Sequence, residues 1–202
     1  MRVIGLSGGI ASGKSLVSER LAELGAVVID ADKLGHESYL PGTDTYRAVI
    51  DAFGADIAGP GGEIDRKALG AKVFGDPEAR RHLEQIVWPA IRRLAVERIE
   101  AQREQGAPVV VLEAAVLIEA EWFDLVDEVW IVEASPDVAR ARLMERNGLT
   151  PAQAQARLQA QLTNEKRRPY ASLVIENNGS LDELRKTVED AWSKLKTRVA
   201  PG

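Results

Sequence analysis

The chain has 202 residues, of which 45% are hydrophobic and 28% charged, and its formal net charge is −5. This composition is typical of one soluble globular domain, and the negative charge argues against nonspecific nucleic-acid binding as the main task. The lack of cysteine excludes disulfides and thiolate chemistry, and it fits a reducing compartment, so we expect a cytoplasmic protein. No apolar run approaches the roughly twenty residues of a membrane span, and the glycine-interrupted start does not resemble a signal peptide.

Short apolar runs alternate with helical patterns along the chain, which predicts a five-stranded parallel α/β sheet flanked by helices. We expect strands at residues 3–6, 26–29, 109–112, 129–132 and 173–175. The first helix places Leu16, Val17, Leu21 and Leu24 on one face. A capping box at Ser180 opens the last helix, whose expected core face comprises Leu181, Leu184, Val188, Ala191, Trp192 and Leu195.

About seventy residues separate the second and third expected strands, which is too many for a simple crossover. Helical patterns cover residues 46–53, 66–74 and 77–105, and we expect Pro89 to break or kink the last of these. We interpret this insert as a substrate subdomain, and a helical decoration without a ligand is the alternative. The single domain is therefore divided into a core (1–33, 106–134 and 171–202), a helical insert (34–105) and a lid region (135–170).

Residues 8–15 match the phosphate-binding motif G-x-x-x-x-G-K-[ST] at every defined position. Glycines let the backbone curl so that successive N–H groups face phosphate oxygens, and the following helix adds the positive end of its dipole. We expect Lys14 to contact the β and γ phosphates and the Ser15 hydroxyl to bind Mg²⁺. The residues expected to bind the nucleotide are Gly8, Gly9, Ile10, Ala11, Ser12, Gly13, Lys14, Ser15 and Leu16.

A phosphate loop alone does not separate a phosphotransferase from a GTP-dependent switch. A switch needs an N-K-x-D motif that reads the base, and the most similar segment, Asn164-Glu165-Lys166, does not fit it. The segment Asp51-Ala-Phe-Gly54 fits the D-x-x-G switch pattern, but it lies within a helical pattern. The sequence therefore favours a small-molecule kinase of the P-loop NTPase fold.

Two carboxylates, Asp30 and Asp32, follow the second strand, whose carboxyl end should open onto the nucleotide crevice. An attacking hydroxyl must lose its proton, so we assign Asp32 as the base and Asp30 as either a Mg²⁺ contact through water or an orienting group. Helix capping by one of the two is the alternative. Arg142 and Arg146 lie four residues apart on one helix face, and we expect them to neutralise charge in the transition state.

A helical hairpin is expected to form a lid that carries these arginines. Asn147-Gly148 ends its first helix and Thr150-Pro151 begins the second. The three consecutive cations at 166–168 are expected to close over the lid.

These motifs together resemble the dephospho-CoA kinase family over nearly the whole chain. The resemblance rests on the phosphate loop, on residues 28–32, 64–69 and 142–148, and on the loop at 174–179. The segments 32–42 and 112–120 are most similar to the kinase half of the bifunctional CoA synthase of animals.

The resemblance implies Mg²⁺-dependent transfer of a phosphoryl group from ATP to the 3′-hydroxyl of the dephospho-CoA ribose, which is the last step of CoA biosynthesis. It implies Asp32 as the base, His36 and Arg66 as acceptor contacts, Asn177 in the adenine-side loop, and Glu113 as a Mg²⁺ contact through water. A structural ion pair is the alternative for Arg66. We expect a monomer or weak homo-oligomer with no nucleic-acid or membrane partner. Another small-molecule kinase, acting on a nucleoside or nucleotide, and a nucleotide-dependent binding module are the alternative functions.

Overall fold

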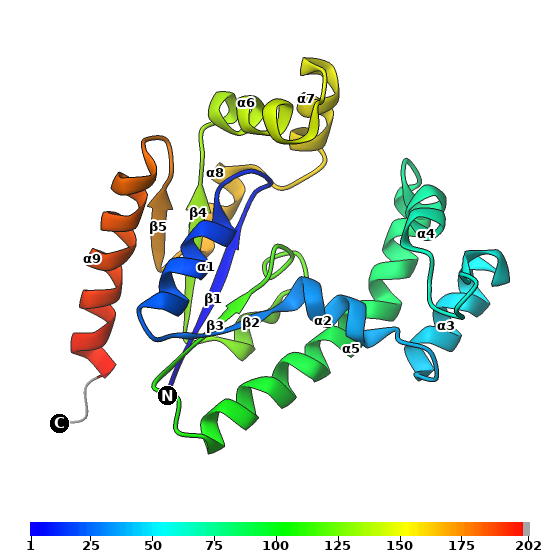
Figure 1. Ribbon diagram of the computed structural model, residues 1–202, viewed down its shortest axis with the longest axis horizontal. Helices are drawn as coiled ribbons and strands as arrows, with labels where there is room; N and C mark the ends of the chain where they lie inside the picture. The colour runs from blue at the N-terminus through cyan, green and yellow to red at the C-terminus, as the bar shows by residue number, and fades with distance from the viewer. Residues whose placement is uncertain (200–202) are drawn as a thin grey trace. The chain divides into compact units, whose positions relative to one another are not determined.

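The computed structural model describes residues 1–199, and its five strands form one parallel sheet with the strand order β2-β3-β1-β4-β5 (Figure 1). This confirms the predicted parallel α/β sheet. The strands are β1 (Arg2–Gly8), β2 (Val27–Asp30), β3 (Val109–Glu113), β4 (Glu128–Glu133) and β5 (Leu173–Glu176).

Strand β1 lies at the centre of the sheet and is paired on both sides. Leu6 is in register with Glu113 of β3 and with Trp130 of β4. All the strands run the same way, so their carboxyl ends share one edge, where Asp30 lies opposite Glu113. Strand β3 lies between β1 and β2.

Two helices pack together against the sheet, α1 (Lys14–Glu23) and α9 (Leu181–Val199). Val17 and Leu21 of α1 are buried in the core with β1, but Leu16 is 44% exposed, so its predicted place on the core face is wrong. Adjacent residues of a helix point about 100° apart, and the buried stripe runs through Val17 and Leu21. Leu181 is likewise 45% exposed, because it begins α9 ahead of the buried stripe.

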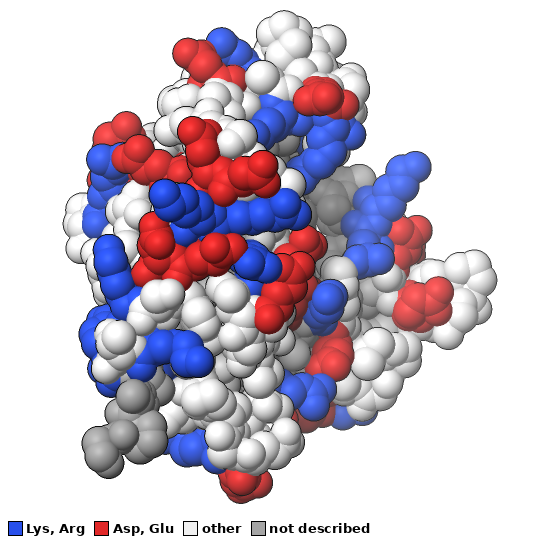
Figure 2. All heavy atoms as spheres, turned by 60° about the vertical axis from the view of Figure 1, so that its left-hand side comes forward, with Lys and Arg blue, Asp and Glu red and all other residues white. Residues whose placement is uncertain are grey.

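The side of the molecule that carries α9 shows positive and negative side chains next to one another (Figure 2). Arg20 illustrates this arrangement, because it pairs with both Glu23 and Glu189. These two hydrogen-bonded carboxylates raise the pKa of the Arg20 guanidinium. The face drawn in Figure 2 therefore mixes both signs of charge instead of presenting a single basic patch.

A helical hairpin, α6 (Pro136–Asn147) and α7 (Pro151–Gln159), follows β4 as predicted. Ser135 caps α6 by accepting a hydrogen bond from the Val138 amide, and Thr150 forms a capping box with Gln153 at the start of α7. Gly148 ends α6 in the left-handed conformation, with φ 60°, which glycine adopts at little cost. The short α8 (Asn164–Arg167) and the 3₁₀ helix η3 (Arg168–Tyr170) then lead into β5, and η2 (Trp122–Leu125) precedes β4.

The chain divides into two compact units, Met1–Asp30 with the chain from Ile99 onward, and Ala31–Arg98. The second unit contains α2 (Ala31–Ser38), α3 (Asp44–Phe53), η1 (Ala55–Ile57), α4 (Arg66–Val73) and most of α5 (Pro77–Glu104). An antiparallel bridge between Ala58 and Ile64 closes the glycine-rich turn between η1 and α4. Pro89 was expected to break or kink the helix, and the break is wrong, since α5 continues through this residue. Burial of the residues that follow it, Ala90, Ile91, Ala95 and Ile99, offsets the lost backbone bond.

Among residues 1–199, no helix is both long and apolar enough to cross a membrane.

Candidate phosphoryl-transfer site

The phosphate loop joins the central strand β1 to α1, and two of its residues adopt left-handed backbone conformations. Ala11 has φ 58° and Gly13 has φ 92°, and the Ser12 amide donates to the Gly9 carbonyl over 3.2 Å, which closes the turn. The first N–H groups of α1 have no acceptor within the helix, so this end attracts anions. The loop therefore has the curled backbone that the motif predicts.

Lys14 lies against Glu113, and the two side chains are 12% and 10% exposed. The Lys14 Nζ donates to the Glu113 Oε1 over 2.5 Å. Glu113 ends β3 in register with Asp30, so the structure brings these three predicted residues to one edge of the sheet. A phosphate group must compete with the Glu113 carboxylate for the Lys14 ammonium.

Oxygen donors suited to Mg²⁺ lie at the same edge. Asp30 and Glu113 are neighbours across β2 and β3, and Ser15 is exposed in the first turn of α1. Within the described part of the chain, no cluster of three or more Asp, Glu, His or Cys side chains could hold a metal ion by itself. These donors fit Mg²⁺, which usually keeps several waters and binds through one or two carboxylates and the substrate phosphates.

A second set of contacts links the phosphate loop to the loop after β5 and to α6. Asn177, only 3% exposed, donates from Nδ2 to the Ser12 carbonyl over 2.8 Å. Arg142 donates to the Asn177 Oδ1 over 3.2 Å and to the Ala11 carbonyl over 3.5 Å. Asn177, expected near the adenine, thus supports the phosphate loop itself. Arg146 instead donates to the Asn147 Oδ1, so the structure does not join it to Arg142.

Two further residues reach the first half of the phosphate loop. Gln161 was indicated by no motif, and Arg167 was expected only to close over the lid with the two cations beside it. The Gln161 Oε1 accepts a hydrogen bond from the Ile10 amide over 2.8 Å. Arg167 is 3% exposed, and its Nη1 would lie 3.2 Å from a methyl group placed on Gly9. Burial lowers the pKa of the Arg167 guanidinium, while the nearby Glu119 and Glu133 oppose that shift. The sequence holds no signal for this burial, because Arg167 lies among three adjacent cations that look alike.

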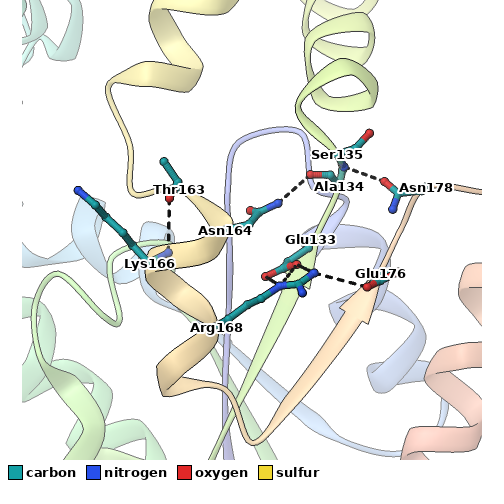
Figure 3. Close-up of polar contacts among 9 residues, drawn as sticks. All are labelled: Glu133, Ala134, Ser135, Thr163, Asn164, Lys166, Arg168, Glu176 and Asn178. Carbon is teal, nitrogen blue, oxygen red and sulfur yellow. Dashed lines mark hydrogen bonds and ion pairs between the residues drawn. The ribbon is translucent and has the colours of Figure 1, made fainter.

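The short helix α8, which carries Arg167, is anchored to the ends of β4 and β5 (Figure 3). Arg168 binds Glu133 through Nε and Nη2, at 3.0 and 2.8 Å from Oε2, and this hydrogen-bonded carboxylate raises the pKa of its guanidinium. The Asn164 side chain donates to the Ala134 carbonyl over 2.9 Å. These contacts fix α8 at the edge of the sheet where the phosphate loop begins.

The remaining candidates belong to the second unit. Asp32 lies in the first turn of α2, which begins at Ala31, so it is inside the helix and does not occupy the N-cap position. Arg66, at the start of α4, lies 2.7 Å through Nη1 from the His36 Nε2. Tyr39 lies edge-on to the His36 ring, and burial raises the pKa of its hydroxyl while Arg66 opposes that shift. The structure thus joins the two predicted acceptor contacts, His36 and Arg66.

The sheet order and the phosphate loop on its central strand place the chain among the P-loop kinases. A family model described as dephospho-CoA kinase matches residues 2–183. The chain belongs to the dephospho-CoA kinase family, which confirms the resemblance seen in the motifs.

Individual relatives agree with this assignment. A dephospho-CoA kinase of Geobacter sulfurreducens is 50% identical over 96% of this chain and 98% of its own. The crystal structure of TT1252 from Thermus thermophilus has a TM-score of 0.79 at 33% identity, covering 96% of this chain and 97% of that one. The dephospho-CoA kinase from Campylobacter jejuni, at 24% identity, shares the fold with a TM-score of 0.64 over 100% of this chain and 98% of its own. The closer likeness to the animal kinase half stays a prediction.

Proposed function

We propose that the protein transfers the γ-phosphoryl group of ATP to the 3′-hydroxyl of the ribose of dephospho-CoA, which yields CoA and ADP. Family membership over nearly the whole chain supports this reaction. The observation that carries the proposal is the phosphate loop with Lys14 at the carboxyl edge of the sheet, beside Glu113. Asp32 follows two residues after Asp30, which ends the strand next to Glu113.

In this reaction the acceptor oxygen forms a bond to the γ-phosphorus as the bond from that phosphorus to the ADP oxygen breaks. The proton of the 3′-hydroxyl passes to the Asp32 carboxylate. Lys14 and the N–H groups of the loop hold the phosphates and oppose the charge that develops on the leaving oxygen.

Mg²⁺ would be held by the Ser15 hydroxyl and, through water, by Asp30 and Glu113. When bound, it neutralises charge on the β and γ phosphates. Glu113 has a second role in this proposal, because its pairing with Lys14 keeps the ammonium at the edge of the sheet where the phosphates bind.

The hairpin within 135–170 is proposed as a lid, with Arg142 and Arg146 as its cations. Arg142 is bonded to the Ala11 carbonyl and to Asn177, so an approach to the phosphates requires it to exchange these contacts. In the helical unit, Arg66 with His36 is the polar pair proposed to hold the acceptor, which itself carries phosphate groups. The cytoplasmic location and the state of monomer or weak homo-oligomer stay predictions.

The first test measures ADP release by the purified protein with MgATP, in the presence and absence of dephospho-CoA. AMP and nucleosides serve as control acceptors. ADP release only with dephospho-CoA, together with CoA formation, supports the proposal. Release with a control acceptor alone points to another small-molecule kinase, and no release with any acceptor points to a nucleotide-dependent binding module.

The role of Asp32 is tested by Asp32→Asn, which keeps the size of the side chain but removes the base. We expect turnover to fall by about 10²- to 10⁴-fold, the usual contribution of a general base, while ATP binding is retained. Asp51→Asn makes the same change at an exposed position of α3 in the same unit and should leave turnover unchanged. Turnover by Asp32→Asn equal to that of Asp51→Asn would remove Asp32 from the role of base.

A further inference from the structure

A cavity of about 190 Å³ lies within the first unit, beside the phosphate loop. Its lining includes Gly9, Ile10 and Ser12 of that loop, together with Gln161 and Arg167. Its volume is several times the roughly 30 Å³ that one water occupies in the liquid. The cavity is therefore large enough for a small polar group, and one side of it is built from the phosphate loop.

Two of the residues that line this cavity each carry a buried polar atom without a hydrogen-bond partner among the described residues. Among the described residues, such side-chain atoms are the Ser12 Oγ, the Arg20 Nε and the Arg167 Nε, and two of these three belong to residues that line the cavity. Buried polar atoms are nearly always paired, so each exception needs an explanation. Two exceptions at one cavity indicate a polar group that binds there.

The charge on Arg167 indicates which kind of polar group binds in the cavity. The guanidinium is almost fully buried, it donates to the Leu162 carbonyl, and its nearest carboxylate, Glu119, lies 3.9 Å away. Glu133, the second carboxylate that acts on the Arg167 charge, is already bonded to the Nε and Nη2 of Arg168. Glu165 also lines the cavity, but it makes no ion pair with Arg167 among the described residues. A buried cation that lacks a close counter-ion is costly, and a bound anion removes that cost.

The position of the cavity along the phosphate loop indicates which anion binds in it. In a phosphate loop, the backbone N–H groups cradle the inner phosphates and the lysine reaches the outer ones. If the free N–H groups at the start of α1 take the inner phosphates, Gly9 and Ile10 at the other end of the loop lie beside the terminal one. The Ile10 amide already donates to Gln161, so a side chain must supply the contact at this end.

We propose that Arg167 is a fixed cation that binds the terminal phosphate of the nucleotide, and that this cavity is the subsite for that phosphate. This inference needs one part of the proposed function, which is that the phosphate loop binds ATP. Arg167 differs from Arg142 and Arg146 in that it does not belong to the hairpin. Its helix is anchored by Arg168 to β4 and β5, so its guanidinium is in place before any nucleotide arrives (Figure 3).

The test compares the affinities of the protein for MgATP and MgADP, measured by calorimetry on the wild type, Arg167→Met and Arg167→Lys. Arg140→Met is the matched control, because the Arg140 side chain, which is 41% exposed, pairs only with Asp137 among the described residues. We expect Arg167→Met to weaken ATP binding by roughly ten- to a hundredfold, the worth of a hydrogen bond to a charged group. ADP affinity should change by less than about twofold, and Arg167→Lys should restore part of the ATP preference because it keeps the charge.

A thermal unfolding curve without nucleotide separates binding from a structural role. Since Arg167→Met removes a buried and incompletely paired charge, its melting temperature should equal or exceed that of the wild type. If Arg167→Met leaves the ratio of ATP affinity to ADP affinity unchanged, whether or not both affinities fall, the proposal is overturned. If Arg167→Met does not fold, the ratio of ATP affinity to ADP affinity is measured in Arg167→Lys instead. A ratio equal to that of the wild type would count against the subsite.

The outcome is independent of the acceptor. A wild type that binds ATP more tightly than ADP but does not phosphorylate dephospho-CoA would contradict the proposed function, and the effect of Arg167→Met on that preference would still decide the subsite.

Discussion

Asn177 offers the sharpest test of how the phosphate loop is held in shape. Its buried side chain donates to the Ser12 carbonyl and accepts from Arg142, so one amide connects the loop, α6 and the end of β5. Asn177→Ala removes both bonds. The backbone bond from the Asn177 amide to the Glu133 carbonyl does not depend on the side chain and should remain.

The size of the effect follows from these two bonds. The bond to Ser12 joins two neutral groups and contributes about 1 kcal/mol, whereas the bond from the Arg142 guanidinium contributes about 1.5 kcal/mol or more. The Ser12 carbonyl would also lose its partner, which adds about 1 kcal/mol where water cannot reach it. We therefore expect Asn177→Ala to lower the free energy of unfolding by about 2–4 kcal/mol and to raise the KM for ATP.

Denaturant unfolding and ATP kinetics check both expectations. Asn178→Ala is the matched control, because this exposed neighbour makes one bond through its side chain, from the Ser135 amide over 2.7 Å (Figure 3). Its loss should cost about 1 kcal/mol or less and leave the KM for ATP unchanged. If both variants unfold alike and bind ATP alike, the account of Asn177 as the support of the loop is wrong.

Two further predictions concern packing and pH. Gly8→Ala would place a methyl group 2.5 Å from the Val132 carbonyl oxygen in the paired strand, so we expect a loss of about 1–3 kcal/mol in unfolding free energy. Gly70→Ala, in open space within α4, should instead be neutral or stabilising by up to about 1 kcal/mol in the same denaturant titration. Glu183 accepts hydrogen bonds from the Ser180 amide and hydroxyl, which lower the pKa of its carboxyl. The ionised Glu183 carboxylate therefore contributes its full stabilisation above the pKa of the unfolded chain, and this stabilisation is lost as the pH falls through the pKa of the folded protein. We expect the wild type to melt at a higher temperature than Glu183→Gln near neutral pH, and this difference to shrink in acid. A difference that grows in acid would contradict the argument.

The fold was largely predictable because its signals are local. Each strand is a short apolar run, and Ser135, Thr150 and Ser180 mark helix starts through the bonds their hydroxyls accept. Errors arose where tertiary packing decides. Leu16 fits the helical period yet is exposed, and Pro89 lies inside an unbroken helix because its neighbours are buried.

The site was predictable only as far as its motif extends. Lys14 follows from the spacing of the loop, and Glu113 from the resemblance, and the structure joins them. The contacts of Gln161 and Arg167 join residues about 150 positions apart, so no local pattern reveals them. Arg167 looks like its neighbours in the sequence, and only the packing of α8 separates a buried cation from exposed ones.

The double pairing of β1 ties ATP recognition to completion of the fold. Ile4 and Leu6 are paired with β3 on one side and with β4 on the other, so the strand that ends in the phosphate loop has no free edge from which to fray. A partly folded chain that lacked either neighbour would hold no shaped loop, and ATP would bind only to molecules in which both β3 and β4 flank β1. By mass action, the nucleotide would then stabilise the finished fold against every incomplete form, and a newly made chain would become an ATP-binding protein and a folded one in the same step.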